Sequence, residues 1–138
     1  MNIEELQFKD KVNVISEEQP ATIFEINVID GTIKYYIDFL NKYNIAPMQI
    51  IYPIYINGQI LLDNGFEYVD GRYYLKDIII ESETYLTKIG DKCNDNLFTV
   101  HGLQHALRQY GHKDLADEFI VRVESLNLCG TQNMPEAN

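Results

Sequence analysis

The stretch Val100-His-Gly-Leu-Gln-His-Ala-Leu-Arg-Gln-Tyr-Gly-His112 decides how the second half of this chain folds. Its apolar residues recur three or four positions apart, a spacing that predicts one buried face of an amphipathic helix. That face consists of Val100, Leu103, Leu107 and Tyr110. Thr99 can cap the start of the helix, and Gly111 can end it in the left-handed conformation. A shorter second helix is expected directly afterwards, with its buried residues at Leu115, Ala116 and Phe119.

The same stretch carries every histidine of the chain, at His101, His105 and His112. Together with Arg108 they fall along one side of the helix, beside the apolar face. Two imidazoles one turn apart can bind zinc, but a zinc site needs a third ligand and usually a carboxylate or thiolate. The glutamate of a His-Glu-x-x-His metalloprotease motif is missing. The three histidines are therefore weak metal-ligand candidates, and we expect a polar or half-buried helix face that holds no metal or other cofactor.

Length and charge limit the class of protein and the kind of partner. The chain has 138 residues, 46% of them apolar, which suits one globular unit. Its 21 acidic residues outnumber the 11 Lys and Arg, so the formal net charge is -10. Such a charge repels the phosphate backbone and disfavours direct binding of nucleic acid. A protein partner with a basic surface is favoured instead.

The cysteines and the apolar runs bear on the cellular compartment. Cys93 and Cys129 lie far apart and form no Cys-x-x-Cys pair, which indicates reduced thiols rather than a disulfide framework or a zinc site. The opening Asn2-Ile-Glu-Glu5 lacks the basic and apolar regions of a secretory signal. No stretch approaches the roughly 18 apolar residues of a membrane span. We therefore expect a cytoplasmic protein without membrane contact.

The first half has the two-residue period of β-strands. Phe24, Ile26 and Val28 alternate with polar residues, and alternation resumes after Asp30-Gly31, from Ile33 to Phe39. The Asp-Gly pair tolerates positive φ angles and predicts a hairpin with a type I′ turn. Two further strands are expected at Lys11–Ile15 and Met48–Ile56. The first half is thus predicted to form a small antiparallel β-barrel or a curled sheet.

A change of period follows residue 56. Asn57 can cap a short helix that runs to Asp63, and Gly65 can end it. A second Asp-Gly pair, Asp70-Gly71, predicts a second hairpin. We expect a further strand between Lys76 and Tyr85, and residues 87–96 as a loop or a ragged hairpin. The expected fold is α+β, with one compact domain at 1–124 divided into parts 1–56 and 57–124, and a flexible tail at 125–138.

No set of residues predicts catalysis. The two cysteines have no neighbouring histidine, the serines have no Gly-x-Ser-x-Gly setting, and the glycines are single. Tyrosines are instead concentrated in the first half, and tyrosine is enriched where one protein surface contacts another. Strict alternation puts Tyr36 on the face opposite Tyr35. The candidate partner-binding residues are Glu25, Tyr36, Asp38, Tyr43, Tyr52, Tyr55 and Arg108.

Several motifs resemble a family of small uncharacterised proteins carried by phages, prophages and mobile elements of Bacteroidetes. The matching pieces are Glu5-Leu-Gln-Phe8, Pro53-Ile54, Leu61-Leu-Asp-Asn-Gly-Phe66, Gly71-x-Tyr-Tyr74, His101-x-Leu-Gln-His-Ala-Leu-Arg108 and Leu115-Ala-Asp-x-Phe119. They cover residues 1–120, and the chain departs from the pattern at Ile37–Tyr52 and after Val121. The resemblance implies a mobile-element setting and a barrel-like first part followed by a hairpin and a helix. The family has no established activity.

These observations favour an interaction protein, an acidic binding module of a phage or mobile element. An anti-defence factor that inhibits a basic host effector, such as a CRISPR nuclease, fits the charge and the implied setting. Two alternatives stay open at this point. One is an accessory protein of phage replication or of the virion, and the other is a small metal-dependent hydrolase that uses the helix histidines.

Overall fold

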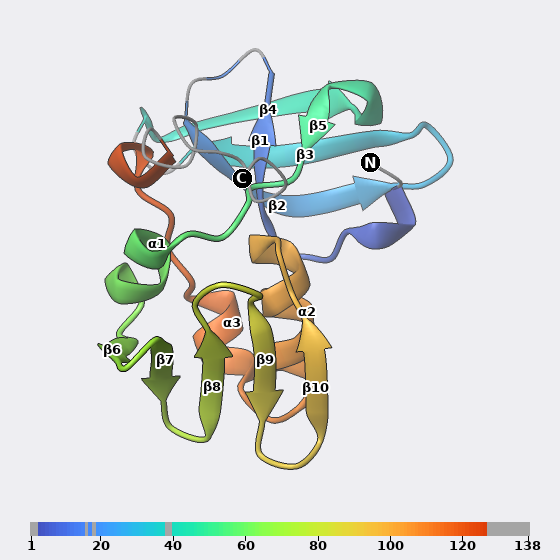
Figure 1. Ribbon diagram of the computed structural model, residues 1–138. Coiled ribbons are helices and arrows are strands. Elements are labelled where there is room, and N and C mark those ends of the chain that lie inside the picture. Colours follow the sequence, from blue (N-terminus) through green and yellow to red (C-terminus); the bar gives the residue numbers. More distant parts are fainter. Residues whose placement is uncertain (1–2, 16, 18, 38–39, 127–138) are drawn as a thin grey trace.

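Two antiparallel sheets form the frame of the molecule, one above the other in Figure 1. The computed structural model describes residues 3–15, 17, 19–37 and 40–126. The first sheet has the order β4-β3-β2-β1-β5 and the second the order β10-β9-β8-β7-β6. The architecture is the predicted α+β fold, with a curled sheet in the first half. None of the described helices is long and apolar enough to cross a membrane.

The first half of the chain contains the upper sheet and two short 3-10 helices. Its elements are η1 (Ile3–Glu5), β1 (Lys11–Val14), β2 (Pro20–Asn27), β3 (Thr32–Ile37), β4 (Lys42–Pro47), η3 (Met48–Ile50) and β5 (Ile51–Tyr52). Strand β3 shows the predicted alternation, because Ile33, Tyr35 and Ile37 are buried while the residues between them are half-exposed. The concave side of the sheet, closed by Leu6 and Met48, holds the first hydrophobic core.

The second half contains the lower sheet and the helices that cover it. Its elements are α1 (Gly58–Asp63), β6 (Glu67–Val69), β7 (Arg72–Leu75), β8 (Ile78–Glu81), β9 (Leu86–Ile89), β10 (Cys93–Asn96), α2 (Val100–Gln109) and α3 (Lys113–Asp117). A last helical turn occupies residues 123–126. Residues 87–96, predicted as a loop or a ragged hairpin, belong to a hairpin of regular register formed by β9 and β10. Ile78, Ile80 and Ile89 pack against α2 in the second hydrophobic core.

Both predicted helix caps are present. The Asn57 side chain accepts a hydrogen bond from the Ile60 N–H, and the Thr99 side chain accepts one from the Gly102 N–H. Gly111 has a φ of 99° directly after α2, as expected of a C′ glycine. The predicted apolar face of α2 is confirmed by the buried Val100, Leu103 and Leu107 and the partly buried Tyr110.

The two Asp-Gly hairpins differ in their turns. At Asp70-Gly71 both residues have positive φ, 52° and 85°, and Val69 pairs directly with Arg72, so the two-residue turn is confirmed. The type I′ turn predicted at Asp30-Gly31 is wrong. There Asn27 pairs with Thr32 across a four-residue loop, and only Gly31 of the loop residues has a positive φ, 68°.

Two further expectations in the first half are wrong. The strand predicted at Met48–Ile56 is reduced to η3 and the two residues of β5. Strand β4 was not predicted. Its alternating Tyr43 and Ile45 are exposed and only Ala46 of its six residues is buried, so the strand has no buried apolar face. Phe24 was expected to face the core, but the register shifts between Ile23 and Glu25, and this bulge turns the Phe24 ring to the other side.

The two halves meet where helix α2 contacts the start of β1, as Figure 1 shows. The described residues form two separate apolar cores, and Ile54 and Ile56 already belong to the second one. Polar side chains connect the first sheet to α2, as where Gln104 accepts from the Lys11 N–H. At the other end of the described chain, Ser125 is buried and donates to Asp63 Oδ2 at 2.9 Å. The rest of the tail predicted at 125–138, from residue 127, lies outside the described residues.

Candidate functional site

The Tyr43 ring contacts two further aromatic rings on the side of the first sheet that faces away from its core. Phe24, Tyr36 and Tyr43 come from β2, β3 and β4 in turn. The Tyr43 ring centroid lies 4.8 Å from that of Phe24 and 4.6 Å from that of Tyr36. Tyr36 and Tyr43 are direct cross-strand partners, and Ile45 follows two residues later on the same side of β4. We call these four residues the aromatic face.

Two of the four residues of the aromatic face are exposed although they are apolar, and the other two, Phe24 and Tyr36, are partly buried. Tyr43 has 64% of its surface exposed and Ile45 57%. Tyr36 donates to Asn41 Oδ1 at 2.6 Å, which orients its ring. Large rings held rigidly on a sheet lose little conformational entropy when they bind, and such rings dominate many protein interfaces. The arrangement therefore suits contact with another macromolecule.

Charged groups border the aromatic face on one side. Lys34 Nζ lies 3.5 Å from a Glu25 carboxylate oxygen and 5.9 Å from the Phe24 ring centroid. A shallow hollow of about 270 Å³ opens beside them. It is lined by Glu25, Asn27, Asp30, Thr32, Lys34 and Ile45. Two carboxylates against one lysine leave the hollow acidic, so it is suited to a cationic side chain of a partner.

The free edge of the first sheet is poorly suited to pairing with another strand. Strand β4 is the edge strand, and Pro47 at its end has no N–H to donate. The N–H of Ile45 is already used, since it donates to Asn44 Oδ1 at 2.9 Å. The side chains of the aromatic face are therefore better suited to contact with another molecule than the backbone of this edge is.

The structure separates the other predicted partner-binding residues from this cluster. Tyr52 lies in β5, at the opposite edge of the sheet, with 44% of its surface exposed. Tyr55 is partly buried and forms a β-bridge with Thr99. The Arg108 side chain is only 13% exposed and belongs to the contact between the halves. Asp38 lies outside the described residues.

The three histidines do not converge. His105 Nε2 lies 2.7 Å from Asp10 Oδ2, whereas His112 Nε2 lies 2.6 Å from Asp77 Oδ1. His101 stacks edge-on against His105, with ring centroids 5.6 Å apart. In the described part of the chain, no group of three or more His, Cys, Asp and Glu side chains is placed to hold a metal ion. His105 and His112 thus each contact a carboxylate on a different element, and these contacts hold side chains in place within the fold.

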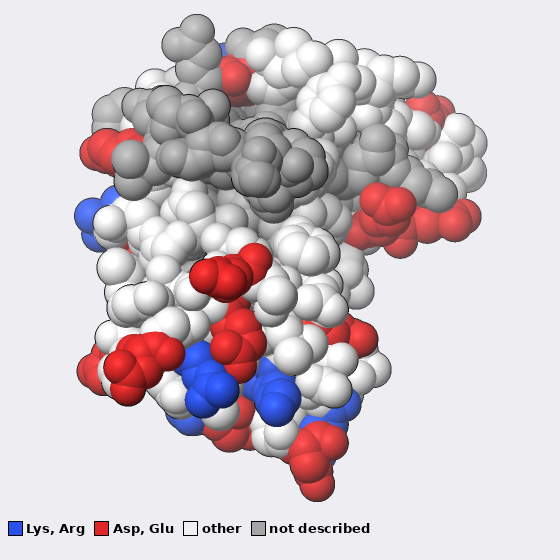
Figure 2. All heavy atoms as spheres, viewed as in Figure 1, with Lys and Arg blue, Asp and Glu red and all other residues white. Residues whose placement is uncertain are grey.

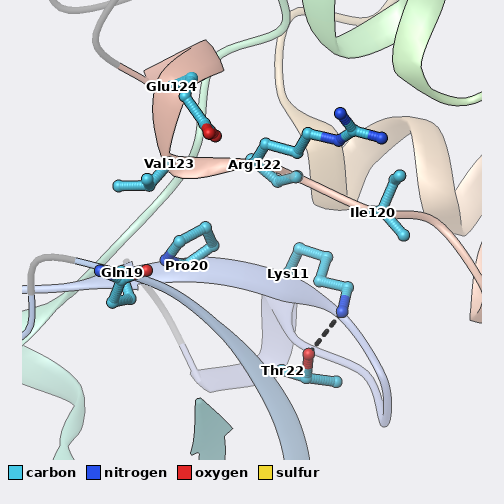
Figure 3. A pocket seen from close by; sticks show the side chains of 9 residues that line it. Lys11, Gln19, Pro20, Thr22, Ile120, Arg122, Val123 and Glu124 are labelled. Atoms are coloured by element: carbon cyan, nitrogen blue, oxygen red, sulfur yellow. Dashed lines mark hydrogen bonds between the residues drawn. The ribbon is translucent and has the colours of Figure 1, made fainter. Parts of the chain in front are cut away.

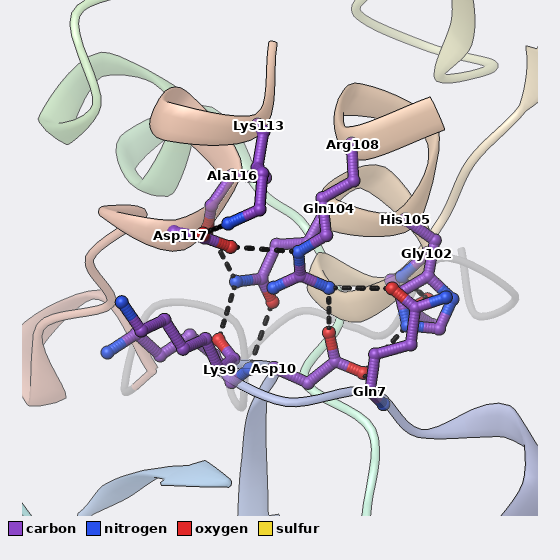
Figure 4. A network of polar contacts seen from close by, with 12 residues as sticks. Gln7, Lys9, Asp10, Gly102, Gln104, His105, Arg108, Lys113, Ala116 and Asp117 are labelled. Atoms are coloured by element: carbon purple, nitrogen blue, oxygen red, sulfur yellow. Dashed lines mark hydrogen bonds and ion pairs between the residues drawn. The ribbon is translucent and has the colours of Figure 1, made fainter. Parts of the chain in front are cut away.

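A polar network around Asp10 connects the two halves (Figure 4). The Asp10 carboxylate is fully buried and accepts from the Gln7 N–H at 2.7 Å and from Arg108 Nη1 at 2.7 Å. Arg108 Nε also donates to Asp117 Oδ1 at 3.0 Å. Beside them, Gln104 accepts from the Lys11 N–H at 2.9 Å and donates to the Lys9 carbonyl at 3.0 Å. The network replaces the missing apolar layer and explains why the polar side of α2 is buried.

Two pKa shifts accompany this network. Burial lowers the pKa of His101 below its usual value, and the nearby His105 adds to this, while Asp10 and Glu5 oppose it. His101 Nδ1 is buried and has no hydrogen-bond partner among the described residues. Burial acts to raise the pKa of Asp117, but hydrogen bonds from Lys113 and Arg108 outweigh it and the pKa is lowered. A neutral imidazole and an ionised carboxylate are therefore favoured.

A groove of about 510 Å³ separates the first sheet from residues 120–124 (Figure 3). Its floor includes Lys11, whose Nζ donates to Thr22 Oγ1 at 2.5 Å, and its other wall includes Ile120 and Val123. One carboxylate, Glu124, lines it. Among the described residues that line the groove, Glu124 has no second carboxylate or histidine beside it with which to form a pair of acid and base groups.

Comparison with known proteins does not assign this chain to a family. No protein-family model matches it, and neither a curated protein nor a solved structure matches it. The site is therefore interpreted from its own geometry.

Proposed function

We propose that this chain is a protein-binding module whose contact surface is the aromatic face together with the acidic hollow beside it. The observation that carries the proposal is the contact of Phe24, Tyr36 and Tyr43 on an exposed sheet face. A partner with arginine or lysine side chains fits best, because a cation can bind the carboxylates of Glu25 and Asp30 and stack on a tyrosine ring.

The net charge of -10 supports a basic partner. It attracts a positively charged protein surface over long range and repels nucleic acid. In Figure 2 the Lys and Arg side chains over the second sheet lie among acidic side chains. The face in view therefore has no wide basic patch.

More specifically, we propose an inhibitor made by a phage or mobile element in the bacterial cytoplasm, where it blocks a basic defence effector such as a CRISPR nuclease. The resemblance of the helix motif His101–Arg108 to proteins of such elements supports the setting, and the acidity supports the class of target. An accessory role in phage replication or in the virion would use the same surface with another partner. The separate ion pairs of His105 and His112 give a metal-dependent hydrolase no support.

A binding experiment with matched tyrosine variants tests the proposal. The tagged protein is incubated with bacterial lysate, the retained protein is identified and purified, and its dissociation constant is measured. Tyr43→Ala should weaken binding at least tenfold, since an exposed central ring behaves as a hot spot. Tyr52→Ala, an exposed tyrosine at the opposite edge of the sheet, should change the affinity less than about twofold.

The inhibitory role needs a separate measurement. Phage plaques are counted on bacteria with active CRISPR interference that produce either the wild-type protein or the Tyr43→Ala variant. Plaques should return with the wild type and not with the variant. If Tyr43→Ala and Tyr52→Ala change the measured affinity equally, the proposed surface is contradicted. If the wild-type protein has no effect on CRISPR interference, the proposed class of target is contradicted.

A further inference from the structure

The tip of the β2–β3 hairpin presents two aliphatic side chains to solvent. Ile29 has 95% of its surface exposed and Val28 has 66%. The tip is the loop at the right of Figure 1, which projects beyond the body of the molecule. In Figure 2 that corner carries uncharged and acidic side chains, and no basic side chain is in view there. An isoleucine held almost entirely in water at the end of a loop contributes nothing to the core.

The loop that presents these side chains is firmly held. Asn27 Nδ2 donates to Asp30 Oδ2 at 3.0 Å, and the Asp30 N–H donates to Asn27 Oδ1 at 3.0 Å. The Gly31 N–H donates to the Asn27 carbonyl at 2.9 Å, and the Met48 N–H donates to the Gly31 carbonyl at 3.1 Å. The positive φ of Gly31 lets the chain return to β3 without strain. Because the polar groups close the loop, the two aliphatic side chains are not needed for its shape.

The charges beside the tip indicate what it contacts. Asp30 lies in the tip, and the acidic hollow that it shares with Glu25 lies directly behind it. A lipid surface is a poor match, because two aliphatic side chains bury little area and anionic headgroups would repel these carboxylates. A second copy of this chain is also a poor match, since a symmetric contact would bring two such acidic tips together. A protein pocket that is apolar inside and basic at its rim is complementary to both the aliphatic side chains of the tip and the carboxylates beside it.

We propose that the tip, Val28 and Ile29, is a preformed apolar plug that enters an apolar pocket with a basic rim on the protein partner. The inference rests on the proposed function, and it adds a second anchor at one end of the aromatic face. Since the plug is rigid before binding, its burial costs little conformational entropy.

Crosslinking and affinity together test the plug. A photo-reactive benzoylphenylalanine is placed at position 29, at position 43 in the aromatic face, or at position 62 in α1 as a remote control. Each variant is irradiated with the purified partner, and the crosslinked peptides are identified. Dissociation constants are then measured for Ile29→Ser and for Ile15→Ser. Ile15 is a matched control, because it is 62% exposed and follows β1 near the start of β2, at the far end of β2 from the tip.

The proposal predicts that positions 29 and 43 crosslink to the same partner while position 62 does not. Position 29 should label apolar residues of that partner. Ile29→Ser should weaken binding about thirtyfold, as expected for a hot spot, and Ile15→Ser less than about twofold. Ile29→Val should keep most of the affinity. Ile29→Ser, Ile29→Val and Ile15→Ser should all have the melting temperature of the wild type, because neither isoleucine side chain is buried.

Other outcomes separate this inference from the proposed function. If position 43 crosslinks but position 29 does not, and Ile29→Ser behaves like Ile15→Ser, the plug is overturned and the aromatic face stands. If neither position crosslinks, both are overturned. Crosslinks from position 29 to a second copy of this chain, to lipid in vesicles of phosphatidylglycerol, or to charged residues of the partner would also overturn the plug.

Discussion

Asp10 shows how much a single side chain contributes to the arrangement of the two halves. Its carboxylate is fully buried, and it contacts His105 and Arg108, which lie more than ninety residues later in the chain. A buried carboxylate of this kind is stable only while cations and N–H groups compensate for its lost hydration. No local pattern in the sequence marks Asp10, because its partners belong to a distant helix. This is why the sequence predicted a polar helix side but not the network that buries it.

Replacing Asp10 should therefore loosen the contact between the halves. Asp10→Asn keeps the shape of the side chain but removes its charge. The 13%-exposed Arg108 side chain then keeps Asp117 as a carboxylate partner and a hydrogen bond to Gln7 Oε1, but it loses its ion pair across the two halves. We expect a loss of about 3 kcal/mol in the free energy of unfolding, measured by urea denaturation. Glu25→Gln, which breaks the exposed pair with Lys34, should cost less than about 1 kcal/mol. Equal losses would mean that the network does not hold the halves together.

His101 should make stability depend on pH. Burial lowers its pKa in the folded protein, whereas in the unfolded chain the value stays near 6.5. Below about pH 6.5 the unfolded state therefore binds more protons at this histidine than the folded state does. The contribution of His101 to the free energy of unfolding is complete above that pH and is lost as the pH falls below it, by at most about 1.4 kcal/mol per pH unit. His101→Leu should reduce the difference between the free energies of unfolding at pH 7.5 and pH 5.5. An unchanged difference would show that His101 is not the group responsible.

Helices and turns could be predicted where neighbouring residues in the sequence determine them. Strands could not be predicted where pairing with another strand determines them. The caps of α1 and α2 follow from Asn57 and Thr99, whose side chains bind backbone N–H groups within the same turn. Strand β4 follows instead from its pairing with β3, because its alternating Tyr43 and Ile45 are exposed and only Ala46 is buried. The bulge that turns Phe24 outward depends on register as well. Since the aromatic face combines this bulge with β4, only Tyr36 and Tyr43 of its members could be predicted from the sequence.

The predicted apolar face of α2 can be tested by its contribution to stability. Leu107 is fully buried in the second core. Leu107→Ala should lower the free energy of unfolding by about 2 to 5 kcal/mol through lost contacts and a residual cavity. Leu62→Ala in α1 is a matched control, because that side chain is 44% exposed, and it should cost within about 0.5 kcal/mol. Similar losses in a urea titration would indicate that α2 is packed differently.

At the scale of the whole molecule, the two sheets have different surfaces. The first sheet carries the aromatic face, the acidic hollow and the exposed tip, all at the β2, β3 and β4 side. The second sheet contributes a core covered by helices and a surface of mixed charge, visible in Figure 2. The net charge could be predicted from the composition. The clustering of aromatic rings and carboxylates on β2, β3 and β4 could not, because it depends on the order of the strands in the sheet. The proposed contact surface thus depends on the fold rather than on a sequence motif.

The combination of long-range charge and short-range apolar contact leads to a kinetic prediction for the proposed partner. Neutralising the hollow with Glu25→Gln and Asp30→Asn should slow association and flatten its dependence on salt, because attraction across solvent acts mainly on the encounter rate. Asn at position 30 can still bond to Asn27, so the loop keeps its closure. Tyr43→Ala should leave the association rate nearly unchanged and raise the dissociation rate, since it removes a contact made only in the complex. Surface plasmon resonance at several salt concentrations separates the two rates. If the charge variant changed only dissociation, the carboxylates would act within the interface, and the acidity of the molecule would play no part in attracting its partner.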